Sequence, residues 1–133
     1  MNSLARENGR AMPSASPEGN ASPSQPTRDE RIRALNDRLR RTGLGGGVCV
    51  TRGVAMLDFA VLALVIDAVV EFTAFGPDND PYGEHDCAVV EVSGLTVIWK
   101  IDYYDRAYTG LSPDAADPSV TRRVLTIMLA SEC

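Results

Sequence analysis

A short stretch between Phe75 and Arg106 collects the residues of this 133-residue chain that are best suited to chemistry. It holds the single histidine (His85), the single lysine (Lys100) and the single tryptophan (Trp99), together with three of the four tyrosines. A histidine beside a carboxylate is the minimum for a general base, or for one metal ligand with its orienting partner. The stretch therefore predicts either proton transfer at His85 or recognition of a partner.

A β-hairpin is expected to position His85. Residues 88–92 and 95–101 are rich in β-branched side chains, and Ser93-Gly94 between them is a two-residue turn signal. This turn would place His85 opposite Asp102, with Cβ atoms about 4.5–5.5 Å apart. His85 would be the base and Asp102 its orienting group, unless the two only satisfy each other structurally. The catalytic candidates on this face are His85, Asp102, Lys100 and Tyr104.

The segment before the hairpin, residues 76–84, is rich in Gly, Pro, Asp and Asn, which predicts a turn-rich loop. Its carboxylates lack the spacing of a calcium loop, so we expect no metal. Residues 43–47 are rich in glycine, but they precede a strand and no lysine follows, so a connector is expected instead of a phosphate loop. The sequence therefore predicts no cofactor.

The charge is unevenly distributed along the chain. The net charge is −5 in total, and residues 45–133 hold five basic and thirteen acidic side chains, a net charge of −8. Direct nucleic-acid binding needs Lys and Arg at the phosphates. Because this part of the chain is acidic, we expect no direct nucleic-acid binding. The acidic part fits a basic protein partner, and the alternative is a solvated surface that maintains solubility.

Cysteine usage and hydrophobicity indicate a cytoplasmic protein with no membrane partner. The odd number of cysteines, without a C-x-x-C motif, is typical of a reducing compartment, and Cys49 is expected to be a small buried residue. The apolar run 54–70 is short and contains two Asp residues, so it predicts a core helix. That helix is apolar nearly all round, which predicts cover by a sheet and another helix, or by a second subunit.

These patterns predict one small α+β domain over residues 27–133, after a disordered tail over residues 1–26. The expected order is α-β-α-β-β-α, with a mainly antiparallel three-stranded sheet and helices packed on one face. The expected elements are a helix over 27–42 with a Thr27–Glu30 capping box, a strand over 48–51, a helix over 58–72, strands over 88–92 and 95–101, and a helix over 118–131 with Arg122 and Arg123 exposed.

Several motifs resemble a family of short proteobacterial proteins catalogued as a domain of unknown function. They are NDPYGEHD (79–86), WKIDYYD (99–105), VLTIMLA (124–130) and RIRALND (31–37). The likeness covers residues 29–131 and implies genes on plasmids and other mobile elements, but no activity. The family pattern is aromatic at position 87, whereas this chain has Cys87, which suits a packing position.

The sequence is compatible with two functions. The first is a small acidic accessory protein of a mobile element that binds and modulates a host or plasmid protein, in a sharper form as a nucleic-acid-mimicking inhibitor. The second is a small hydrolase that uses His85 and Asp102, assisted by Lys100, Tyr104 or Glu84. The missing nucleophile makes the interaction protein the preferred prediction. The expected partner-binding residues are Asp78, Asp80, Tyr82, Glu84, His85, Trp99, Asp102, Tyr103 and Asp105.

Overall fold

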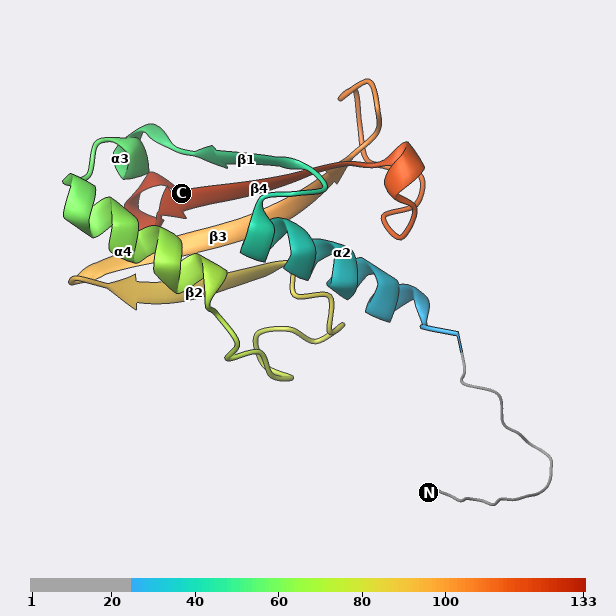
Figure 1. Ribbon diagram of the computed structural model, residues 1–133, viewed down its shortest axis with the longest axis horizontal. Coiled ribbons are helices and arrows are strands. Elements are labelled where there is room, and N and C mark those ends of the chain that lie inside the picture. Colours follow the sequence, from blue (N-terminus) through green and yellow to red (C-terminus); the bar gives the residue numbers. More distant parts are fainter. Residues whose placement is uncertain (1–24) are drawn as a thin grey trace, which may run out of the picture.

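Four strands form one mixed sheet in the order β1-β4-β3-β2 (Figure 1). The computed structural model describes residues 25–133, so the predicted tail over residues 1–26 lies almost entirely outside the described residues. Strand β1 (Gly47–Val50) is parallel to β4 (Arg122–Leu129). Strand β3 (Leu95–Tyr104) is antiparallel to both β4 and β2 (Cys87–Val92). The α+β class is confirmed, but the sheet has four strands and is mixed.

The main error of the prediction is the C-terminal helix, which is strand β4. Arg123, Leu125 and Ile127 are buried and alternate with residues that are partly exposed. This period of two is the strand pattern, and pairing with β1 on one side and β3 on the other satisfies the backbone of the segment. In place of the start of the predicted helix there is only the 3-10 turn η2 (Pro118–Val120), whose N-terminus is capped by the side chain of Asp117. A second 3-10 turn, η3 (Ala130–Glu132), follows the strand.

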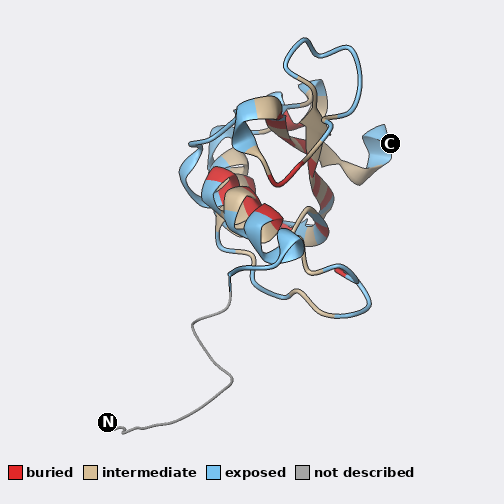
Figure 2. Ribbon diagram, turned by 90° about the vertical axis from the view of Figure 1, so that its right-hand side faces the viewer, coloured by how far each residue is buried: buried red, intermediate tan, exposed pale blue. Residues whose placement is uncertain are grey.

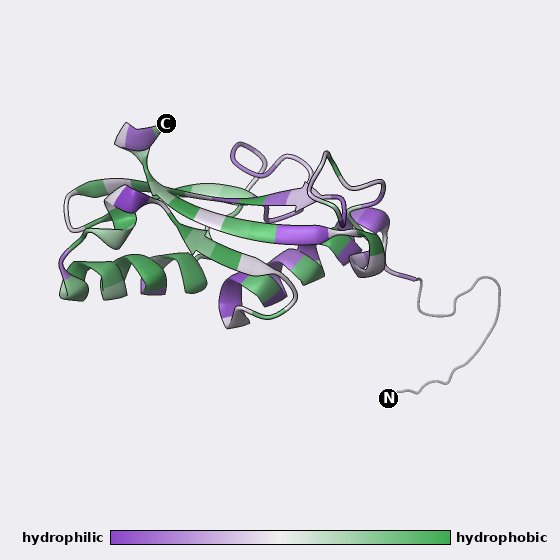
Figure 3. Ribbon diagram, turned by 90° about the horizontal axis from the view of Figure 1, so that it is seen from above, coloured by the Kyte–Doolittle hydropathy of each residue, from purple (hydrophilic) through white to green (hydrophobic). Residues whose placement is uncertain are grey.

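The first predicted helix is confirmed as α2 (Arg28–Thr42). Thr27 and Glu30 form the expected capping box, and Gly43 ends the helix in the left-handed conformation at φ 76°. The predicted second helix is α4 (Phe59–Val70), capped by Asp58 and preceded by the short helix α3 (Arg52–Ala55). Helices α2 and α4 lie on the same side of the sheet, as predicted (Figure 3).

The hairpin register is confirmed from Cys87–Lys100 to Val92–Leu95. Ser93 and Gly94 both have positive φ, as a tight two-residue turn requires. Alternate residues of β2 and β3 therefore face the helices, and the residues between them form the open face of the sheet. That open face carries Glu91, Thr96, Lys100, Asp102 and Tyr104, as expected, together with Cys49, which is exposed and not buried.

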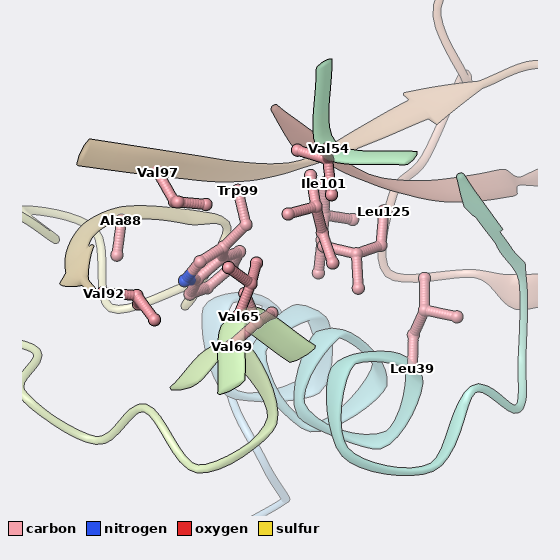
Figure 4. Close-up of a cluster of buried hydrophobic side chains, with 11 residues drawn as sticks. Leu39, Val54, Val65, Val69, Ala88, Val92, Val97, Trp99, Ile101 and Leu125 are labelled. Atoms are coloured by element: carbon pink, nitrogen blue, oxygen red, sulfur yellow. The ribbon is translucent and has the colours of Figure 1, made fainter. Parts of the chain in front are cut away.

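The core lies between the sheet and helices α2 and α4 (Figures 2 and 4). Trp99 is its largest buried side chain, and Figure 4 shows it against Val65 and Val69 of α4. Burial of one aromatic or large aliphatic side chain stabilises a fold by about 1.5–3 kcal/mol, so this contact fixes α4 on the sheet. None of the helices in residues 25–133 is long and apolar enough to cross a membrane.

Candidate functional site

His85 does not face Asp102, so the predicted pair is wrong. His85 has a φ of 55°, which takes the chain out of the strand geometry just before β2 begins. Its ring therefore points into the helix layer, where Nδ1 lies 2.8 Å from Oδ1 of Asp37. Asp102 instead forms an ion pair with Lys100 on the open face of the sheet. The predicted catalytic set is thus divided between two faces of the sheet.

The surroundings of His85 leave its ring little free surface. Nε2 lies 3.7 Å from Oδ2 of Asp80, and the backbone N–H of His85 donates to the other oxygen of the same carboxylate. The ring stacks on Phe75 with centroids 3.7 Å apart and an interplanar angle of 7°. Both ring nitrogens therefore face carboxylates of the protein itself, which orient the imidazole.

Arg40 lies fully buried beside this histidine. Its guanidinium donates to the backbone oxygens of Val69, Val70 and Phe72, and it forms an ion pair with Asp37 at 3.0 Å. Three carbonyls at the C-terminal end of α4 are thus satisfied by a side chain of α2. The burial lowers the pKa of Arg40, and the bond to Asp37 opposes that shift. Arg40 therefore joins the two helices.

A second set of hydrogen bonds continues from α2 to the sheet. Asn36 donates from Nδ2 to the backbone oxygen of Glu84 and to the hydroxyl of Tyr103, and its Oδ1 accepts from Arg123 at 2.6 Å. The Tyr103 hydroxyl donates to Glu84 at 3.0 Å, and burial raises the pKa of Tyr103 above its usual range. Asn36 therefore uses both ends of its amide.

We call these residues the polar cluster: Asn36, Asp37, Arg40, Asp80, Glu84, His85, Tyr103 and Arg123. It connects α2, the loop over residues 71–86, β3 and β4. Its hydrogen bonds run between protein groups, and the ring of His85 has Asp37 and Asp80 as its polar neighbours in the described part of the chain. This arrangement is suited to holding α2 on the sheet.

The remaining predicted binding residues do not form one surface. Trp99 is fully buried in the core, whereas Tyr82 is 75% exposed on the loop before β2. Asp78 is exposed in the same loop, and Asp105 accepts hydrogen bonds from Thr109 within its own turn. In residues 25–133, no group of three His, Cys, Asp or Glu side chains is arranged to hold a metal ion.

Sequence reasoning missed four members of the polar cluster: Asn36, Asp37, Arg40 and Arg123. One signal was available, because Asn36 falls on the same stripe of α2 as Ile32 and Leu39, which are both buried. A polar residue on a buried stripe must find partners, so Asn36 indicated a polar contact below the helix. Arg123 carried no such signal, because the strand that buries it was predicted as a helix.

Comparison with known proteins gives a family but no activity. Residues 50–132 match a family described as a protein of unknown function (DUF3768). No curated protein and no solved structure matches the chain. The matched range contains α4 and strands β2 to β4, whereas α2, which supplies three residues of the polar cluster, precedes it. The match covers more than half of the chain, which therefore belongs to the DUF3768 family of proteins of unknown function.

Proposed function

We propose that this chain is a small, non-enzymatic interaction protein whose partner docks on the outer face of α4. One observation carries the proposal. Met56, Phe59 and Leu64 are 74%, 83% and 51% exposed, and they lie on and just before this helix. Large apolar side chains gathered on one surface are typical of interaction sites.

Helix α4 has two contrasting faces. Val65 and Val69 are buried against the sheet, whereas the outer side of the first two turns carries Phe59, Ala60, Ala63 and Leu64, all of them exposed. The sequence pattern predicted cover on most of this helix, and the fold covers only one side of it. The helix is coloured as hydrophobic over most of its length in Figure 3. A partner that covers the outer side would complete the predicted burial.

The charges near α4 specify the chemistry of that partner. No Lys or Arg occurs between residues 53 and 99, whereas Asp58, Asp67 and Glu71 flank the apolar residues of the helix. A second copy of the chain would oppose these carboxylates with its own. A protein groove with an apolar floor and a rim of Lys or Arg complements the helix in both respects. We therefore propose a basic protein partner.

Two narrower forms of this function remain predictions. As an accessory protein of a mobile element, the chain would modulate a protein of its host or plasmid. As a nucleic-acid mimic, it would occupy a nucleic-acid-binding site, and the exposed carboxylates Asp67 and Glu71 would lie against basic residues of that site. The mimic form predicts binding that weakens steeply as salt increases.

The hydrolase alternative depends on a different pair from the one expected. Asp37 is the carboxylate at 2.8 Å from Nδ1 of His85, so it would orient the base in place of Asp102. Nε2, the nitrogen that would act on a substrate, faces Asp80. Lys100 and Tyr104 were expected to assist, but they lie on strand β3 with side chains on the open face. This geometry favours binding over hydrolysis.

The test uses the full chain as bait in a lysate of the organism that encodes it. Wild type is compared with Phe59→Ser/Leu64→Ser and with Leu111→Ser, a matched control whose side chain is 84% exposed in another loop. We expect one stoichiometric partner, captured by wild type and the control and lost with the α4 variant. Isothermal titration with the purified partner then measures salt dependence.

Two results would contradict the proposal. One is equal capture of the partner by the α4 variant and wild type, since the helix would then contribute nothing. The other is the absence of any partner at low salt. Exposed apolar residues contribute little to the core, so each substitution should leave the fold intact. Circular dichroism of all three proteins checks this.

A further inference from the structure

We infer that a cavity beside the glycine-rich connector binds a nucleoside diphosphate or a ligand of the same chemistry. The cavity has a volume of about 470 Å³ and is lined by Gly45–Gly47, Arg106, Tyr108, Thr121, Arg122 and Arg123. It lies at the β1–β4 edge of the sheet, between the connector and the loop over residues 105–121. This loop and α4 lie at opposite ends of the sheet, so the site is separate from the proposed docking face (Figure 1).

The charge of the cavity contrasts with that of the whole chain. Of the residues that the structure describes, three arginines and no Asp or Glu line it, although acidic residues outnumber basic ones by 18 to 13 in the sequence. Ion pairs in the described part of the chain involve Arg28, Arg33 and Arg40, but none of the three cavity arginines. The exposed guanidinium groups of Arg106 and Arg122 therefore favour an anionic ligand, whereas Arg123 is buried.

The carboxylates closest in sequence are held elsewhere. Asp105 accepts from the backbone and hydroxyl of Thr109, and Asp117 accepts from Ser119. These bonds lower the pKa of both carboxyl groups. Asp114 lies 3.4 Å from the guanidinium of Arg28. The local acids therefore do not neutralise the cavity arginines.

Two of the three cavity arginines, Arg106 and Arg122, are only loosely bound to the protein. Arg106 and Arg122 each make one hydrogen bond of 3.4 Å to a backbone oxygen, which is long for a guanidinium donor. Arg123 is anchored through Nε to Asn36 and through one terminal nitrogen to Ala115. Its other terminal nitrogen has no hydrogen-bond partner in the described residues. The guanidinium fork matches the oxygens of a phosphate group.

The connector forms a wall without side chains. A Cβ at Gly46 would lie 2.3 Å from the backbone oxygen of Arg123, so only glycine allows the connector to approach β4 this closely. Gly45 has a φ of 93°, a conformation that other residues rarely adopt. Three successive glycines thus leave the cavity open beside the arginines.

Tyr108 favours a ligand that carries an aromatic base. It is 58% exposed and has a φ of 58°, which is unusual for an aromatic residue and indicates a backbone held in place by its surroundings. The guanidinium of Arg122 lies over one face of its ring, 5.6 Å from the centroid, so a base stacked on the opposite face of Tyr108 would have its phosphates near that arginine. Cavities of about 300–1,000 Å³ hold whole small molecules, far larger than one phosphate ion.

The test is isothermal titration of the full chain with ADP and with pyrophosphate in low salt. Arg122→Gln should weaken the binding of both probes by about tenfold, because one charge-assisted contact is lost. Arg38→Gln removes the same charge from an exposed site on α2 and should change nothing. Tyr108→Ala should weaken ADP by about fivefold or more and leave pyrophosphate unchanged.

Several outcomes would overturn the assignment. These are the absence of binding by wild type, equal effects of Arg122→Gln and Arg38→Gln, and equal affinity for ADP and pyrophosphate. A single-stranded oligonucleotide that binds more tightly than ADP would assign the cavity to nucleic acid instead. The α4 variant Phe59→Ser/Leu64→Ser should bind ADP like wild type, so the two proposals fail independently.

Discussion

Arg40 and Arg122 illustrate two uses of arginine within one small protein. Arg40 is enclosed: it bonds three backbone oxygens and Asp37, and its guanidinium lies 5.1 Å from the ring centroid of Trp99. Arg122 lines an open cavity, and among residues 25–133 it has no carboxylate partner and makes one long hydrogen bond. Both terminal nitrogens of Arg40 are paired, although its buried Nε has no partner in the described residues, so this arginine is committed to the fold, whereas Arg122 keeps its donors available for a ligand.

The largest expected effect is that of Arg40→Met. The substitution leaves Asp37 and three backbone oxygens without their donor, so the free energy of unfolding should fall by about 3–5 kcal/mol. Urea unfolding followed by circular dichroism measures this change. A loss below about 1 kcal/mol would mean that water replaces the guanidinium, and the contrast with Arg122 would disappear.

A double-mutant cycle between Asp37 and His85 should show the next largest effect. Their contact of 2.8 Å predicts a coupling energy of about 1–2 kcal/mol, because a hydrogen bond to a charged group is lost. The substitutions are Asp37→Asn and His85→Ala. The matched cycle of His85→Ala with Asp102→Asn should be additive within about 0.5 kcal/mol. A larger coupling energy between His85 and Asp102 than between His85 and Asp37 would restore the pair expected from the hairpin register.

Acid should destabilise the protein through its exposed, hydrogen-bonded carboxylates. Hydrogen bonds lower the pKa of Asp105, Asp117 and Glu132, so the unfolded chain binds more protons than the folded one. Their contribution to the free energy of unfolding is present above their ordinary pKa values, about 4. It is lost as the pH falls towards their pKa values in the folded protein. The melting temperature should therefore fall less on acidification in Asp105→Asn than in wild type.

Asp86 should act in the opposite direction. Burial raises the pKa of Asp86. Its contribution to the free energy of unfolding is therefore present at low pH and is lost as the pH rises through its pKa in the folded protein. Asp86→Asn should remove this part of the pH dependence. If Asp105→Asn and Asp86→Asn shift the pH profile in the same direction, the contrast between the hydrogen-bonded Asp105 and the partly buried Asp86 is wrong.

Arg122→Gln should have the smallest effect on stability. The side chain is exposed and has no ion-pair partner in the described residues, so the free energy of unfolding should stay within about 0.5 kcal/mol of wild type. Differential scanning calorimetry without ligand measures it. A clear loss of stability would show that Arg122 is committed to the fold, like Arg40.

Local signals were the reliable part of the sequence. The capping box at Thr27 and the Ser93-Gly94 turn form as predicted, and the second helix begins next to its predicted first residue, Asp58. Each of them depends on residues within a few positions of one another. The register of the hairpin follows from its two-residue loop, and the open face follows from that register.

The errors concern residues whose state depends on distant partners. Residues 122–129 have apolar positions that fit either a helix or a strand, and only the space between β1 and β3 selects the strand. His85 follows the strand period in the sequence, but its positive φ and the stack on Phe75 turn it to the other face. The residues neighbouring each segment in the sequence indicate neither the space between β1 and β3 nor the contact of His85 with Asp37 of α2.

By itself, the sequence determined the α+β class, the first two main helices, the hairpin with its register, and the acidic character of the chain, whereas Trp99 was expected at a binding surface and is buried. The tertiary structure alone decided the fourth strand, the polar cluster and the arginine-lined cavity, since each joins residues more than 25 positions apart. Short-range hydrogen bonds fix caps and turns, whereas strand pairing and the burial of charge depend on which surfaces the folded chain brings together.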